Sequence, residues 1–205
     1  NVRDSVTVEG DGFDPFTLDV TCIDNGMPLV MLRAEDVGRT GYEADDTLNA
    51  DTDLKTRVEA LRLAAARRMG LGDVSAKNYP KMTLVARPRD GGSIATRSFI
   101  PHVCHDAIGV LAALTVATAC ALRGSVCEGI ASVADGLSKK VVVEHPSGEF
   151  TVDLGLDPDA PQRVRQAALL RTARMLMRGE VFVPAAAWPS SSGVRTARAE
   201  DPRRF

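Results

Sequence analysis

The residues best suited to chemistry stand together in the run His102-Val103-Cys104-His105-Asp106. Imidazole and thiol side chains transfer protons near neutral pH, and an imidazole can also donate a hydrogen bond to a carboxylate. The run precedes an uncharged, largely apolar stretch, residues 107–122, that suits a helix. The N–H groups at a helix amino end lack intrahelical partners and favour an anion. We therefore expect this end, with His102 or His105 as added donors, to hold a carboxylate of a small organic acid.

The same run has more ordinary interpretations. Asp106 in a first helical turn is also a plain capping arrangement. Cys104 is the best candidate for a reactive thiol, because a helix amino end and a histidine both lower a thiol pKa, but a half-buried structural cysteine fits equally well. His102 and His105 have a spacing that could bind a metal, yet no third partner is evident except the distant His145, so we expect no metal.

Other candidates for carboxylate recognition lie far from this run in the sequence. Asn25 and Gly26 occupy a break between two strand-like runs, where their ordinary role is to form a turn. Arg171, Thr172 and Arg174 could form a second carboxylate clamp, since a guanidinium matches a carboxylate through two hydrogen bonds, or could simply face outward from a strand. The sequence has no Walker loop, dinucleotide fingerprint, HExxH or GxSxG pattern, which argues against most hydrolases, kinases and dehydrogenases.

The element that must position the run is the helix expected between Asp106 and Arg123, over residues 107–122. Its apolar side chains point to every side, so it must be enclosed. At about 1.5 Å per residue it is on the order of 24 Å long, which is short for a bilayer span, and we expect a core helix wrapped by sheet. Alternation and turn residues predict strands, and a capped helical pattern predicts a second helix with Arg62 facing water. The strands are expected at 6–9, 16–23, 28–33, 82–87, 93–99, 140–144 and 149–156, the second helix at 51–69, and residues 167–183 fit either a helix or a hairpin.

The composition of the 205 residues, 44% hydrophobic and 25% charged, predicts one domain with a substantial core. A net charge of −2 gives no general attraction to nucleic acid or to an anionic membrane. The four cysteines lack CxxC or zinc-type spacing, which favours reduced thiols and a cytoplasmic location. Because the chain opens on Asn1 in a strand-like stretch, we also expect a portion upstream of it.

Four ordered blocks resemble the PrpF-type isomerase family. They are CIDNGMP (22–28), PKMTLVARPRDGGSIATRSFIPHVCH (80–105), HPSGEFTV (145–152) and LLRTARMLMRGEVFVP (169–184). The resemblance covers nearly all of residues 1–187 and implies a diaminopimelate-epimerase-like α+β domain, in which a curved, mostly antiparallel, barrel-like sheet wraps one buried central helix. It also favours the hairpin for residues 167–183 and leaves 188–205 as a disordered tail.

The resemblance implies an isomerase that works without a cofactor. Family members interconvert unsaturated tricarboxylic acids by removing and returning a proton, which for this chain implies keto–enol or double-bond isomers of 4-oxalomesaconate in bacterial catabolism of gallate-like aromatic acids. The lysine and cysteine usually assigned to proton transfer lie in a first domain, so this chain resembles the second domain. A first domain or a second chain would complete the site, and a homo-oligomer is compatible. The residues matching the family's substrate-facing wall are Asn25, Gly26, Ile100, Pro101, His102 and His105.

Two alternatives remain at this stage. One is a related racemase or epimerase that uses Cys104, with His102 and His105 as further weak candidates for proton transfer. The other is a carboxylate-binding remnant that has lost its first domain and does not catalyse.

Overall fold

The computed structural model describes residues 1–10, 12–170, 174–184 and 187. The chain divides into two compact units, Asn1–Arg171 and Thr172–Phe205. In the second unit, residues 174–184 form neither helix nor strand, so the hairpin expected over 167–183 is not formed within the described residues. Of the expected arginine clamp, Arg174 is exposed in this irregular segment, whereas Arg171 and Thr172 lie outside the described residues, as does the expected tail at 188–205.

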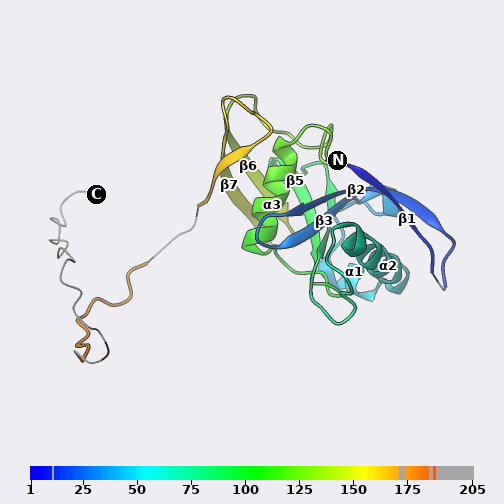
Figure 1. Ribbon diagram of the computed structural model, residues 1–205, viewed down its shortest axis with the longest axis horizontal. Coiled ribbons are helices and arrows are strands. Elements are labelled where there is room, and N and C mark those ends of the chain that lie inside the picture. Colours follow the sequence, from blue (N-terminus) through cyan, green and yellow to red (C-terminus); the bar gives the residue numbers. More distant parts are fainter. Residues whose placement is uncertain (11, 171–173, 185–186, 188–205) are drawn as a thin grey trace. The chain divides into compact units, whose positions relative to one another are not determined.

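The first unit is built on one eight-stranded sheet in which spatial order follows chain order (Figure 1). Strands β3 and β4 pair in parallel, as do β5 and β6, and every other neighbouring pair is antiparallel, which confirms the mostly antiparallel prediction. The strands are β1 (Asp4–Val8), β2 (Phe16–Asp24), β3 (Pro28–Arg33), β4 (Lys81–Ala86), β5 (Ile94–Phe99), β6 (Ser138–His145), β7 (Gly148–Leu156) and β8 (Val164–Leu169).

Helices cover both faces of the sheet (Figure 1). They are the 3-10 turn η1 (Glu35–Val37), α1 (Asp45–Ala50), α2 (Thr52–Arg68) and α3 (Val110–Ala121). Because successive strand residues face opposite sides, Leu29 and Met31 of β3 join the core around α3, whereas Val30 and Leu32 join the core under α2. Strand β3 is therefore buried on both faces, which explains its continuous apolar run.

Helix α3 is the expected central helix, but it begins later than its sequence suggested. Gly109 is its N-cap, and the residues from Asp106 to Ile108 lie outside the helix. Its first turn is exposed at Val110 and Leu111, so the prediction of an apolar helix enclosed on every side is wrong at this end. The remainder is buried or half-buried, with β6, β7 and β8 contacting it on one side and β2 and β3 on another.

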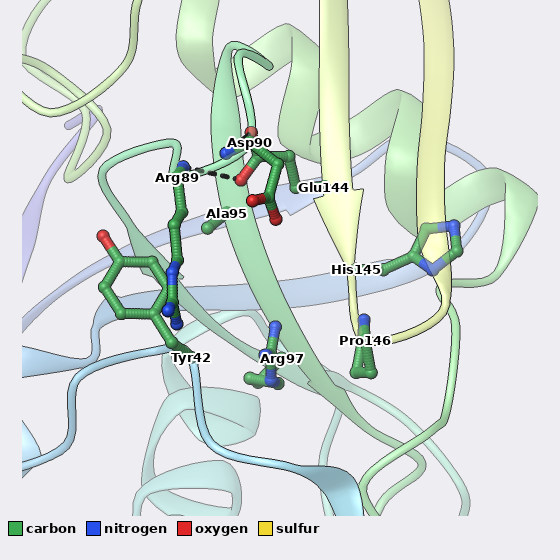
Figure 2. Close-up of a pocket in the computed structure, with 8 residues that line it drawn as sticks. All are labelled: Tyr42, Arg89, Asp90, Ala95, Arg97, Glu144, His145 and Pro146. Atoms are coloured by element: carbon green, nitrogen blue, oxygen red, sulfur yellow. Dashed lines mark hydrogen bonds between the residues drawn. The ribbon is translucent and has the colours of Figure 1, made fainter.

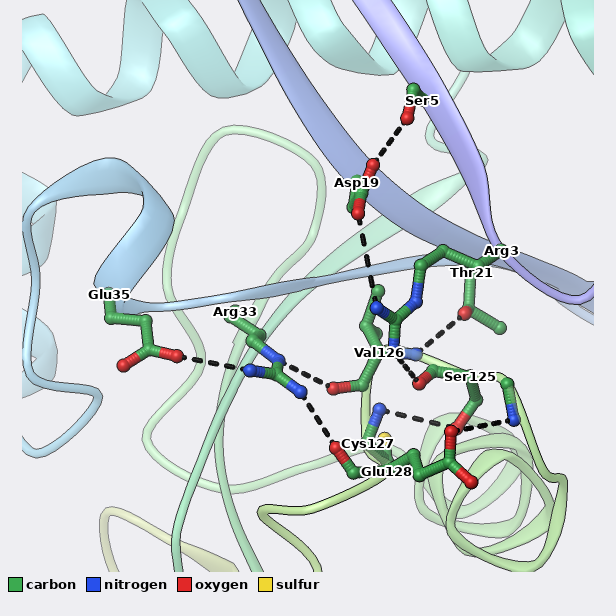
Figure 3. A network of polar contacts seen from close by, with 11 residues as sticks. Arg3, Ser5, Asp19, Thr21, Arg33, Glu35, Ser125, Val126, Cys127 and Glu128 are labelled. Carbon is green, nitrogen blue, oxygen red and sulfur yellow. Dashed lines mark hydrogen bonds and ion pairs between the residues drawn. The ribbon is translucent and has the colours of Figure 1, made fainter.

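The loop that follows α3 is fastened to β2 and β3 (Figure 3). Arg33 donates from Nε to the carbonyl of Val126 at 2.9 Å and from Nη2 to the carbonyl of Glu128 at 2.7 Å. The Val126 N–H donates to Thr21 Oγ1 at 3.0 Å, and Ser125 Oγ donates to the carbonyl of Ala119 at 2.7 Å. These bonds set the position of the helix relative to the sheet.

Helix α2 matches its predicted span, and Asp51 caps it by accepting the Leu54 N–H at 3.0 Å. Burial alone would raise the pKa of Asp51, but this hydrogen bond and the Arg39 guanidinium outweigh burial, so the pKa is lowered. Arg62 contradicts the prediction of a water-facing side chain, because it is fully buried. It binds the Glu59 carboxylate through two nitrogens and donates to the carbonyls of residues 74, 77 and 79, which anchors the loop leading to β4.

Candidate functional site

The segment after β5 folds back along that strand instead of entering a helix. The Ile100 N–H donates to the carbonyl of Val103 at 2.9 Å, Cys104 forms a bridge with Phe99, and the His105 N–H donates to the carbonyl of Ser98 at 2.8 Å. Sequence reasoning placed His102, Cys104 and His105 at a helix amino end. That placement is wrong because these backbone groups pair with β5 first, and α3 starts only at Val110.

His102 lies exposed in the turn between β5 and Cys104. Its Nδ1 is 3.4 Å from Oε2 of Glu59, the α2 carboxylate that also binds Arg62. A protonated His102 therefore has an acidic partner on α2, whereas a neutral His102 leaves its ring available to a ligand.

Cys104 has the properties of a structural cysteine. It is 2% exposed, and its backbone N–H and carbonyl are both bound by the side-chain amide of Asn49, at 2.7 and 3.2 Å. Burial raises the pKa of the Cys104 thiol to about 11, although the nearby Arg97 lowers it in part. The expectation of a low-pKa thiol is wrong, because the helix amino end that would have lowered this pKa is elsewhere.

His105 lies between two partners that require opposite states of its ring. The Ala107 N–H donates to Nδ1 at 2.9 Å, which requires an unprotonated nitrogen. The Asp106 Oδ1 lies 2.8 Å from the same atom and accepts from it when the nitrogen is protonated. When Nδ1 carries a proton, Asp106 Oδ1 can accept it in a hydrogen bond, and when Nδ1 carries none, the Ala107 N–H can donate to it. Either state of the ring is therefore held in place, which suits a group that orients or polarises a substrate.

Asn25 and Gly26 form the turn between β2 and β3, where Gly26 supplies the positive φ of 83°. Across the sheet, Val30 is in register with Met82 and Met82 with Phe99. The Asn25 turn and the turn after β5 therefore lie at the same end of the sheet, two strand spacings or roughly 10 Å apart.

At that end of the sheet, the two turns lie beside helices on different faces. Asn25 lines a cavity beside Thr118 and Leu122 of α3, opposite residues of β8. His102 instead contacts Glu59 of α2. The structure brings the predicted residues to one end of the sheet but does not place Asn25 and His102 around one cavity.

Sequence reasoning missed a polar cavity at the end of β6, beside β5 (Figure 2). It has a volume of about 250 Å³ and is lined by Tyr42, Arg89, Asp90, Ala95, Arg97, Glu144, His145 and Pro146. Burial lowers the pKa of His145, which also interacts electrostatically with His105, Asp106 and Arg97. The one sequence signal for this cavity was an arginine, Arg97, inside an otherwise uncharged strand.

In the part of the chain that the structure describes, no group of three or more His, Cys, Asp or Glu side chains is placed to hold a metal ion. Cys22, Cys104, Cys120 and Cys127 are all free thiols. Among the described helices, none has the length and apolar character that crossing a bilayer requires.

Known proteins resemble this chain in both sequence and structure. The model of the PrpF protein family matches residues 2–184. A 4-oxalomesaconate tautomerase of Pseudomonas putida is 54% identical over 171 residues, which are 83% of this chain and 46% of that protein. A (4E)-oxalomesaconate Delta-isomerase of Novosphingobium sp. is 55% identical over 166 residues, 81% of this chain and 46% of that protein.

A solved structure shows the same fold. The crystal structure of a methylitaconate-delta-isomerase superimposes with a TM-score of 0.74 at 23% identity, covering 96% of this chain and 53% of the other. An open sheet that wraps one helix and carries polar turns at one end thus defines a PrpF-like α+β domain. The chain belongs to the PrpF protein family, and it spans about half the length of the curated relatives it matches.

Proposed function

We propose that this chain forms the second half of an isomerase that interconverts the keto and enol, or double-bond, isomers of 4-oxalomesaconate without a cofactor. The observation that carries the proposal is the identity of 54% and 55%, over about four fifths of the chain, to two proteins named for reactions of oxalomesaconate. A cytoplasmic location and a role in the catabolism of gallate-like aromatic acids belong to the same proposal.

The chain's contribution would be to bind and orient the substrate. Removing a proton next to a carbonyl creates enolate charge, which preorganised hydrogen-bond donors stabilise. The turns containing Asn25, Gly26, Ile100 and Pro101 and the rings of His102 and His105 are proposed to supply these contacts. His105 is the best placed for this role, because its Nδ1 lies within hydrogen-bond distance of both a donor, the Ala107 N–H, and an acceptor, Asp106 Oδ1.

The acid and base are proposed to come from a first domain or a second chain. Residues 174–184 support the need for further protein. They fall inside the family match, yet Met175, Leu176, Met177, Val181 and Phe182 are 79% to 91% exposed. Apolar side chains exposed to this extent are candidates for burial against a first domain, a second chain or another copy in a homo-oligomer.

The alternative of a racemase using Cys104 has little physical support. A thiol with a pKa of about 11 and 2% exposure is protonated and shielded at neutral pH. The alternative of a carboxylate-binding domain without catalysis also predicts binding of the substrate. Only a measurement of turnover distinguishes this alternative from the proposal.

The test is turnover of 4-oxalomesaconate, followed by ultraviolet absorbance, for the 205-residue chain beside a form extended upstream. Activity in either form supports the proposal, and activity in the extended form alone assigns the acid and base upstream. We expect His105→Ala to reduce kcat/KM about 10- to 100-fold, the value of one charge-assisted hydrogen bond. Val103→Ala, an apolar change in the same turn, is the matched control. Binding of the tricarboxylate without turnover in both forms would contradict the proposal.

A further inference from the structure

Arg97 is a buried cation that forms no ion pair within the described part of the chain. It lies in the middle of β5, is 8% exposed, and donates from Nε to the carbonyl of Glu43 at 2.6 Å and from Nη1 to the carbonyl of Thr96 at 2.8 Å. Its Nη2 has no hydrogen-bond partner among the described residues, and no carboxylate there lies within ion-pair distance of its guanidinium. A buried charge is costly unless it is paired, so an anion bound next to the Arg97 guanidinium would be stabilising.

A second guanidinium lines the same cavity. The Arg89 guanidinium lies over the Tyr42 ring, 5.4 Å from its centroid, and Figure 2 shows the two side chains together. Tyr42 Oη donates to the carbonyl of Arg87 at 2.8 Å, which fixes the ring that supports Arg89. Arg89 and Arg97 are close enough for their charges to interact, and neither forms an ion pair among the described side chains.

Two carboxylates close to the arginines are held by backbone N–H groups. Glu144 accepts N–H groups from Arg89, Asp90 and Gly92 at 2.8, 2.9 and 2.7 Å. Glu43 accepts the N–H groups of Thr40 and Gly41 at 2.6 and 2.9 Å. Asp90, also on the cavity wall, has an exposed side chain. Asp45, a half-buried carboxylate whose charge also acts on Arg97, lies outside ion-pair distance of both guanidinium groups. The backbone thus binds Glu144 and Glu43, and no described carboxylate forms an ion pair with Arg89 or Arg97.

The cavity suits a carboxylate group. Its volume of about 250 Å³ admits one arm of a small polycarboxylate, and its lining offers two guanidinium groups, those of Arg89 and Arg97. Guanidinium groups bind carboxylates through paired, charge-assisted hydrogen bonds. Cys104 is bridged to Phe99 of β5, the strand that carries Arg97, and interacts electrostatically with Arg97, so the cavity lies near the segment proposed to bind substrate.

We propose that Arg97 and Arg89 form a binding site for one carboxylate of the substrate. This inference rests on the proposed function, since a tricarboxylate needs cationic partners beyond the turns at the end of the sheet. Arg97 would provide the buried, fixed contact through Nη2, and Arg89, held on Tyr42, would provide the second contact from the mouth of the cavity.

The experiment is calorimetric titration of the 205-residue chain with tricarballylate, a saturated tricarboxylate, and separately with sulfate. The variants are Arg89→Gln, whose exposed side chain leaves folding unaffected, and Arg97→Lys, which keeps the buried charge but loses the forked geometry. We expect each to weaken tricarballylate binding about 10- to 100-fold. Arg87→Gln, an exposed change on the same loop, is the matched control and should bind as the unchanged chain does.

Each outcome decides the inference. Equal affinity in all four proteins, or no tricarballylate binding by the unchanged chain, would overturn it. Sulfate binding that depends on the two arginines while tricarballylate binding does not would mean a site for inorganic anions, which also overturns it. Arginine-dependent tricarballylate binding, with turnover of 4-oxalomesaconate by neither the 205-residue chain nor the extended form, would uphold the site and reject the proposed function. Turnover with a KM unchanged by either variant would reject the site alone.

Discussion

Replacing Gly92 by alanine tests how the loop before β5 is held. A Cβ at this position would lie 2.6 Å from Glu144 Cγ and 2.7 Å from its Oε1, distances at which one group must move. Glu144 is buried and paired within β6, so its carboxylate would be displaced from the N–H groups of Arg89, Asp90 and Gly92. The substitution would therefore break contacts made by the loop that carries Arg89.

The cost follows from the contacts that are lost. A hydrogen bond to a charged group contributes about 1.5–3 kcal/mol, so losing one or two should lower the free energy of unfolding by about 2–4 kcal/mol. Without the clash, a glycine-to-alanine change would stabilise the chain by about 0.4–1 kcal/mol, because it reduces the entropy of the unfolded state. A lower free energy of unfolding for Gly92→Ala would therefore indicate the clash with Glu144, and a higher one would indicate only the entropy effect.

The assay is urea unfolding followed by circular dichroism, arranged as a double-mutant cycle with Glu144→Ala. Removing the Glu144 side chain makes room for the new methyl group, so Gly92→Ala should cost much less in that background, with a coupling energy above about 1 kcal/mol. Equal effects of Gly92→Ala in both backgrounds, or stabilisation of the unchanged chain by it, would refute the reasoning.

Three further predictions concern buried or capping groups. Arg62→Met should lower the free energy of unfolding by about 3–5 kcal/mol, because the partly buried Glu59 carboxylate loses its arginine partner. The exposed change Arg67→Met should alter the free energy of unfolding little. Similar urea midpoints for the two variants would contradict the prediction. The lowered pKa of Asp51 means that its pairing with Arg39 stabilises the fold above about pH 3.9 and is lost as the pH falls through the lowered value. The difference in the free energy of unfolding between the unchanged chain and Asp51→Asn should therefore become smaller as the pH falls. A difference that does not change with pH would contradict the prediction. Because the pKa of Cys104 is about 11, Cys104→Ser should leave the rate of native thiol labelling at pH 7.4 unchanged, and a clear slowing would show a reactive thiol.

Local sequence patterns were sufficient for most individual elements. The alternation and turn residues around Gly26, the Asp90-Gly91-Gly92 loop and the Pro146-Ser147-Gly148 turn predicted hairpins that the structure confirms. The capped pattern that opens at Asp51 predicted α2 within a residue. These features depend on neighbours in the chain, because turn geometry, capping and side-chain period are short-range effects.

The tertiary structure decided the features that depend on pairing between distant segments. The composition of residues 106–123 fits a helix throughout, but the chain pairs back along β5 through Cys104 and His105, so α3 begins at Val110. That difference raises the Cys104 pKa instead of lowering it.

The burial of charged side chains could likewise not be predicted from the sequence pattern. Arg62 and Arg97 look like ordinary solvent-facing residues of a helix and a strand, yet both are buried. Their acceptors are backbone carbonyls far along the chain, at Tyr79 for Arg62 and at Glu43 for Arg97. The sequence by itself predicted the first seven strands, the two main helices and the family. Only the folded chain decided which charges are enclosed, because the energy of a buried charge depends on groups that folding alone brings together.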